Sequence, residues 1–115
     1  MAAVTTNTRY QGVSVQMEAY AATSAPVLVA NENNPLVVSY AQLTGAMTIN
    51  ANVSKLKQFQ HITFLFSTDA SQRIVTFGTG FVSSGTLTIA ASKDAVAQGI
   101  FDGTNIRITN REGQA

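Results

Sequence analysis

Few side chains in this sequence could do chemistry, and their spacing matches none of the common catalytic sites. His61 is the only histidine and there is no cysteine, so a Cys–His nucleophile pair and a thiolate zinc site are excluded. No serine lies in the Gly-x-Ser-x-Gly turn that exposes a hydrolase nucleophile. Alternation along the run His-Ile-Thr-Phe places His61 opposite Ile62 and Phe64, which predicts an exposed strand residue rather than a general base.

The carboxylates are also poorly placed for catalysis or metal binding. None of the six forms a close-spaced pair in the sequence, and no calcium-loop pattern is present. Gly78-Thr79-Gly80 lacks the third glycine of a dinucleotide fingerprint, so it predicts a turn. We therefore predict no catalytic, metal-binding or cofactor-binding residue, no cofactor, and a protein that is not an enzyme. The carboxylates are Glu18, Glu32, Asp69, Asp94, Asp102 and Glu112.

The charge content narrows the range of partners. Charged residues make up 11% of the 115 residues, and 45% are hydrophobic, whereas an ordinary domain is about 25% charged. This balance excludes intrinsic disorder. Seven basic and six acidic residues lie scattered along the chain, which disfavours nucleic acid and anionic membranes as partners.

No apolar run approaches the roughly 20 residues of a membrane span, and the start lacks the basic and apolar parts of a secretion signal. We expect a soluble protein.

Short runs in which apolar and polar residues alternate predict β-strands, because residues i and i+2 lie on one face of a strand. Leu65 is apolar in addition to its neighbours Phe64 and Phe66, which leaves burial on both faces open for that strand. The alternating runs are residues 13–20, 47–53, 62–66, 74–77, 86–89 and 106–109.

Turn residues separate these runs. Asp102-Gly103 is the strongest hairpin signal, and it pairs a strand ending at Phe101 with one starting at Ile106. Residues 31–35 indicate a loop, and residues 54–58 a helical turn. For residues 92–101 we favour a turn at Lys93 followed by a strand over a short helix capped by Ser92.

The spacing of these elements defines the expected fold class. Strands at intervals of about ten residues predict an all-β single domain, an antiparallel β-sandwich or a jelly-roll or barrel-like fold, over residues 11–115. Residues 1–10 are mostly polar, end with Arg9 and Tyr10, and predict an extended N-terminal arm.

Residues 62–105 carry a pattern of known type. A Thr-Phe-Leu-Phe strand is followed by Val-Thr-Phe-Gly, then a small-residue hairpin, and finally Phe-Asp-Gly-Thr-Asn. This order resembles a β-rich segment of structural proteins of tailed bacteriophages, including virion decoration modules and fibre ends. One departure is Ile106, where such segments often carry an aromatic residue.

The resemblance implies a phage virion protein that binds other virion proteins and resides in the particle after assembly in the host cytoplasm. The length favours a capsid decoration or cement protein bound to the major capsid protein. A tail fibre tip or adaptor is the first alternative, and a lectin-like carbohydrate-binding module is the second, although the chain has no Trp and only three Tyr. A surface with few charges provides little electrostatic repulsion between copies of a protein. We therefore expect a homo-oligomer, a trimer or dimer. Arg9, Tyr10 and Tyr20 are candidate interface residues.

Overall fold

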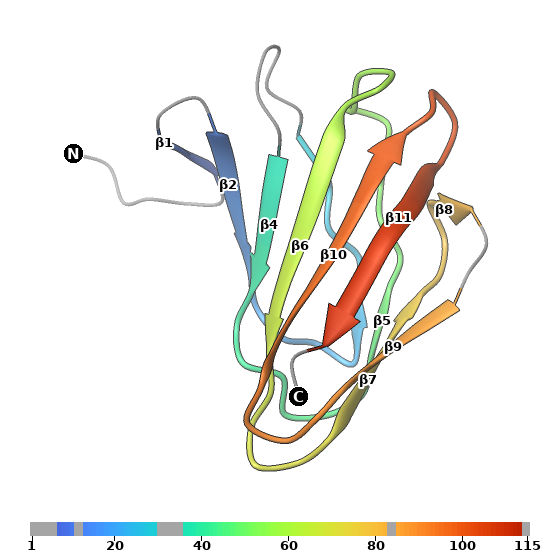
Figure 1. Ribbon diagram of the computed structural model, residues 1–115. Coiled ribbons are helices and arrows are strands. Elements are labelled where there is room, and N and C mark those ends of the chain that lie inside the picture. Colours follow the sequence, from blue (N-terminus) through green and yellow to red (C-terminus); the bar gives the residue numbers. More distant parts are fainter. Residues whose placement is uncertain (1–6, 11–12, 30–35, 83–84, 114–115) are drawn as a thin grey trace.

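The computed structural model describes residues 7–10, 13–29, 36–82 and 85–113, with side chains for residues 15–29, 36–82 and 85–109. These residues form eleven β-strands in two sheets and contain no helix, so the all-β prediction is confirmed. The seven-stranded sheet runs in the order β1 (Asn7–Tyr10), β2 (Val13–Glu18), β4 (Leu36–Tyr40), β6 (His61–Ser67), β10 (Asp94–Phe101), β11 (Ile106–Gly113) and β8 (Phe81–Val82). The four-stranded sheet runs β3 (Thr23–Ser24), β5 (Met47–Ile49), β7 (Arg73–Phe77) and β9 (Gly85–Ile89), and Figure 1 shows β5, β7 and β9 behind the larger sheet.

The chain coils from one sheet to the other between β2 and β7. Successive strands alternate between the sheets, so that β2, β4 and β6 are parallel neighbours, as are β3, β5 and β7. Each circuit of the chain thus adds one strand to each sheet, which is the path of a solenoid. The prediction of antiparallel sheets is wrong for this part of the chain. Parallel neighbours need a long return connection, and here the strand in the opposite sheet provides it.

The C-terminal third is antiparallel instead, except that the short β8 pairs parallel with β11. β10 pairs with β6 and with β11, and β9 pairs with β7. Phe101 and Ile106 are partners in the β10–β11 hairpin, which confirms the hairpin predicted around Asp102-Gly103. The strand favoured for residues 96–101 is also confirmed as part of β10, whereas residues 54–58 form turns rather than a helical turn.

One hydrophobic core fills the space between the two sheets. Phe64 of β6 meets Phe77 of β7 with ring centroids 6.3 Å apart, and Phe81 contacts both rings. Such tilted and edge-to-face contacts are favourable arrangements of aromatic rings. Alternate residues of each strand contribute to this core; the largest fully buried side chains are Phe64, Phe77, Leu28, Leu36, Leu43, Met47, Ile49, Ile62, Ile89 and Ile106.

The end of the predicted N-terminal arm belongs to the larger sheet. Asn7–Tyr10 form β1, the edge strand, and pair antiparallel with β2 from Asn7 opposite Gln16 to Tyr10 opposite Val13. The rest of the predicted arm, residues 1–6, and the predicted loop 31–35 lie outside the described residues.

Candidate interaction surface

Among the described side chains of β2, the apolar Val15 and Met17 lie on the outer face of the sheet. Gln16 is only 3% exposed, whereas the neighbouring Met17 is 52% exposed. The Gln16 amide is fully used, because its Nε2 donates to the Val27 carbonyl at 3.0 Å and to Glu18 Oε2 at 2.8 Å, and its Oε1 accepts from the Val29 amide at 3.4 Å. A buried side-chain amide needs such partners, and the segment after β3 supplies two of them, while Met17 on the other side of β2 faces solvent.

β6 also turns an apolar side chain outward. Leu65 is 40% exposed and lies on the same face as His61 and Thr63, while Ile62, Phe64 and Phe66 are buried. Burial on both faces, which the sequence left open for this strand, is therefore wrong. The expectation that His61 lies opposite the buried residues is confirmed.

The strand register aligns these outward residues in two rows across β2, β4, β6 and β10. One row contains Val15, Val37, Thr63 and Gln98, and the other Met17, Ser39, Leu65 and Val96. We call these eight residues the central outer face. Five of them are apolar and none is charged. Met17 and Leu65 are exposed, and Val15, Val37 and Val96 are partly buried. Apolar side chains gathered on one exposed face are typical of surfaces that bind another protein.

A pocket opens beside the central outer face, at the C-terminal ends of β4 and β6. β4 and β6 are paired as far as Ser39 and Leu65, and beyond this point lies a pocket of about 270 Å³. Inside it Tyr40 and Phe66 stack with ring centroids 5.4 Å apart, and burial raises the pKa of the Tyr40 hydroxyl to about 12. The lining residues are Ser39, Tyr40, Leu65, Phe66, Ser67, Asp94 and Ala95.

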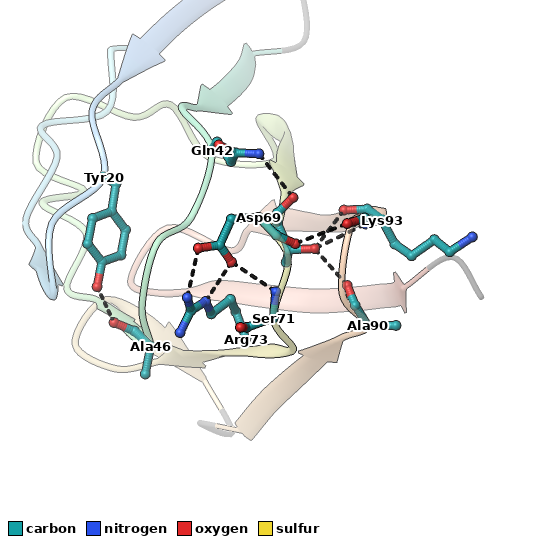
Figure 2. Close-up of polar contacts among 10 residues, drawn as sticks. Tyr20, Gln42, Ala46, Asp69, Ser71, Arg73, Ala90 and Lys93 are labelled. Carbon is teal, nitrogen blue, oxygen red and sulfur yellow. Dashed lines mark hydrogen bonds and ion pairs between the residues drawn. The ribbon is translucent and has the colours of Figure 1, made fainter.

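The loops at the same end of the molecule form a network of hydrogen bonds (Figure 2). Arg73 donates to both oxygens of Asp69 at 2.9 and 2.8 Å, which holds the pKa of Asp69 below its ordinary value. The buried Thr68 hydroxyl donates to the Ala90 carbonyl at 2.6 Å. The same hydroxyl accepts a hydrogen bond from the Lys93 amide at 3.1 Å. These contacts occupy the polar groups of the loops within the molecule, which points to a structural role.

The outside of the smaller sheet has a different character. Four threonines are direct neighbours across it, Thr23, Thr48, Thr76 and Thr86, one on each strand. Threonine pairs stabilise adjacent strands, and their hydroxyls can be satisfied by water. Ile74 of β7 is also exposed on this face, so the two outer faces differ in the row of threonines.

The structure places only one side chain of the three predicted interface residues. Tyr20 is half-buried against the core, and its hydroxyl donates to the Ala46 carbonyl at 2.9 Å (Figure 2). Arg9 and Tyr10 belong to β1, and their side chains lie outside the described part of the chain. Contact of these residues with a partner stays a prediction. The central outer face was missed as a site, although the alternation of residues 13–20 carried the signal.

The titratable groups with the largest shifts also have partners within the fold. Asp102 accepts from the amides of Asn105 and Thr104 and from Arg107 Nε, and these bonds lower its pKa to about 2.

Over the described ranges no three His, Cys, Asp or Glu side chains gather as a metal site would require. No helix of those ranges is long and apolar enough to span a membrane. The chain matches no protein-family model, no curated protein and no solved structure.

Proposed function

We propose that the chain is a structural protein of a tailed-phage particle that decorates the capsid and stabilises the shell of the major capsid protein. The central outer face is its docking surface. One observation carries the proposal: the two central rows of a four-strand surface expose Met17 and Leu65 and contain no charged side chain. The pattern over residues 62–105 supports the choice of a phage particle.

The chemistry of this face specifies the partner. Burying a charge without a counter-charge is costly, and burying apolar surface contributes about 25 cal/mol per Å². A face built from Val, Met, Leu, Ser, Thr and Gln thus fits a protein surface that is equally low in charge, and it fits neither nucleic acid nor an acidic lipid headgroup. A permanent neighbour in an assembled shell meets this requirement.

Reconstituted binding tests the proposal. Capsids of the encoding phage, assembled from the major capsid protein without this chain, should bind the purified protein at saturable, regularly spaced sites. A Met17→Lys, Val37→Lys variant should bind at least about tenfold more weakly, because burying an unpaired ammonium costs well over 1.4 kcal/mol. The matched control is Ile74→Lys on the opposite sheet, which should bind like the wild type.

The location of the protein in intact particles provides the second readout. Density for the chain on the capsid supports a decoration protein, and density at the tail alone supports the fibre-tip or adaptor alternative. Particles without the polypeptide, or capsids that bind the lysine variant as well as the wild type, would overturn the proposal.

A further inference from the structure

β9 is the edge strand with the least protection against pairing. A strand at the edge of a sheet exposes unpaired backbone groups, and proteins protect such edges with charged residues, with proline or by keeping the strand short. β3 and β8 have two residues each, β1 carries Arg9, and β11 beyond β8 contains Arg111 and Glu112. β9 has five residues, Gly85–Ile89, with neither a charge nor a proline. Among the described strands it pairs with β7 alone, and Figure 1 shows it at the margin of the molecule.

One hydrogen bond establishes which way the backbone of β7 points. In a strand, the N–H and C=O of one residue point to one neighbouring strand, and those of the next residue point to the other. The Gly78 amide donates to the Ile49 carbonyl of β5 at 2.9 Å. Gly78 therefore faces β5, and the preceding Phe77 faces β9. Phe77 is the partner of Gly85 in the β7–β9 ladder, so these two residues form a hydrogen-bonded pair.

The backbone groups of Thr86 and Thr88 consequently point away from β7. Alternation along β9 directs its first, third and fifth residues toward β7. The amides and carbonyls of the two threonines face the unpaired side of the strand. The next outward carbonyl is that of Ala90, and it accepts from the Thr68 hydroxyl at 2.6 Å. The free edge is therefore confined to the two threonines, which present two donors and two acceptors.

This edge is complementary to itself about a two-fold axis. When a second β9 runs antiparallel with its Leu87 opposite the first Leu87, Thr86 of each copy lies opposite Thr88 of the other. Both threonine pairs are then hydrogen-bonded positions, and each exchanges two bonds. Every outward amide hydrogen of the edge thus meets a carbonyl oxygen, and no charged residue faces another. On the outer face, the threonine pairs continue the row that ends at Thr86.

We propose that two copies of this chain associate through β9, by antiparallel pairing centred on Leu87. The two four-stranded sheets then form one continuous sheet. Because the same strand serves on both sides, the contact is isologous and closes at a dimer. The central outer face belongs to the larger sheet and stays accessible in this dimer. The inference does not depend on the proposed function.

The size of the contact predicts a weak dimer. Protein interfaces contain about one hydrogen bond per 100–200 Å², so two pairs with two bonds each correspond to roughly 400–800 Å². Stable complexes bury about 1,200 Å² or more, and smaller contacts are typical of transient ones. We therefore expect association that rises with protein concentration and reverses on dilution.

Amide hydrogen exchange tests the orientation of β9 together with the contact. In dilute solution the amides of Thr86 and Thr88 should exchange at least about tenfold faster than that of Leu87, which is bonded to β7. At millimolar concentration the two threonine amides should become protected, whereas the Leu87 amide should change little. Nuclear magnetic resonance resolves the three amides individually.

Charge-swap variants test the register. Like charges directly opposite each other destabilise a strand pair, so Thr86→Lys, Thr88→Lys and Thr86→Glu, Thr88→Glu should each stay monomeric in analytical ultracentrifugation. Their equimolar mixture should form mixed dimers, and the wild type should approach the mass of a dimer as its concentration rises. Ser71→Lys, Gln72→Lys adds the same charge to an exposed turn outside β9 and should dimerise like the wild type.

A proline variant removes one outward donor without a bond of the β7–β9 ladder. Proline is tolerated on an edge strand where the N–H faces solvent, so Thr88→Pro should unfold in urea with the wild-type midpoint and lose dimerisation.

Three results would refute the β9 dimer: a wild type that is monomeric at millimolar concentration, threonine amides that are protected even in dilute solution, or a charge-swap mixture that does not dimerise. Protection that arises only on capsid binding would assign the edge to the capsid protein instead of a second copy. Capsid binding relies on Met17 and Val37, so its failure is a separate result.

Discussion

Gln16 and Met17 are neighbours on β2, yet the polar side chain is buried and the apolar one is exposed. The free-energy cost of burying the Gln16 amide is offset by its hydrogen bonds to the Val27 carbonyl and the Val29 amide. Solvent thus meets the residue that would normally belong to a core. Gln16 thus stabilises the fold, whereas the Met17 side chain is accessible to a protein partner.

Substitution of these two residues should therefore have opposite consequences. Gln16→Ala leaves two backbone groups without their side-chain partner and should lower the free energy of unfolding by about 1–3 kcal/mol. Met17→Ala should change it by less than about 0.5 kcal/mol, as is usual for exposed positions. Urea denaturation measures both. A larger loss for Met17→Ala would contradict the orientation of β2.

The Thr68 hydroxyl should be essential to the loops at the pocket end. It is buried, lies 2.6 Å from the Ala90 carbonyl and accepts from the Lys93 amide at 3.1 Å. Thr68→Val keeps the shape and removes both bonds, so the free energy of unfolding should fall by about 1–3 kcal/mol. Thr88→Val on the exposed side of β9 is the matched control and should be close to neutral. Equal effects of the two substitutions would refute this role.

Acid should weaken the β10–β11 hairpin through Asp102. Its pKa is lowered from 3.8 to about 2 by the amides of Asn105 and Thr104 and by Arg107. A carboxylate with a lowered pKa contributes stability above its unfolded pKa and loses it as the pH falls through the folded value. The stability difference between the wild type and Asp102→Asn should thus be constant above pH 3.8 and vanish as the pH falls through about 2. Urea midpoints across this range measure it, and a difference that persists in acid would argue against the carboxylate.

Alkali should act through Tyr40. Burial raises its pKa from 10.0 to about 12, the hydrogen bond with Ser24 opposes this shift, and the charge of Glu18 adds to it. A group with a raised pKa contributes fully below its unfolded pKa and loses that contribution as the pH rises through the folded value. Stability should therefore decline between pH 10.0 and about 12, and less so in Tyr40→Phe. The ultraviolet absorbance of tyrosinate should include a step near the upper value that the variant lacks.

Local signals in the sequence predicted local structure well. The hairpin at Asp102-Gly103 was predictable because Gly103 has φ of 103°, which glycine adopts readily, and because Asp102 caps the turn with its own carboxylate. The placement of Val75 and Phe77 on the face opposite Ile74 and Thr76 likewise follows from alternation within one strand. Such features depend on residues close together in the chain.

The features that involve distant residues could not be predicted in this way. Alternation has the same period in parallel and antiparallel strands, so it does not encode the coiled path through β2, β4 and β6. It separates Gln16 from Met17 but does not say which of them faces the core. The pocket depends on where β4 and β6 part, and the exposure of Phe59 depends on its hydrogen bond to Phe101. Each of these is decided by tertiary contacts.

The coiled path also has a consequence for how the molecule opens. In a chain that winds coil upon coil, each coil is supported mainly by its neighbours, and stability varies along the stack. β1 and β2 form one margin of the larger sheet, whereas β6 is covered on both sides by β4 and β10. Amide hydrogens should accordingly exchange with deuterium first in β1 and last in β6, so that the N-terminal margin detaches while the Phe64–Phe77 centre stays closed.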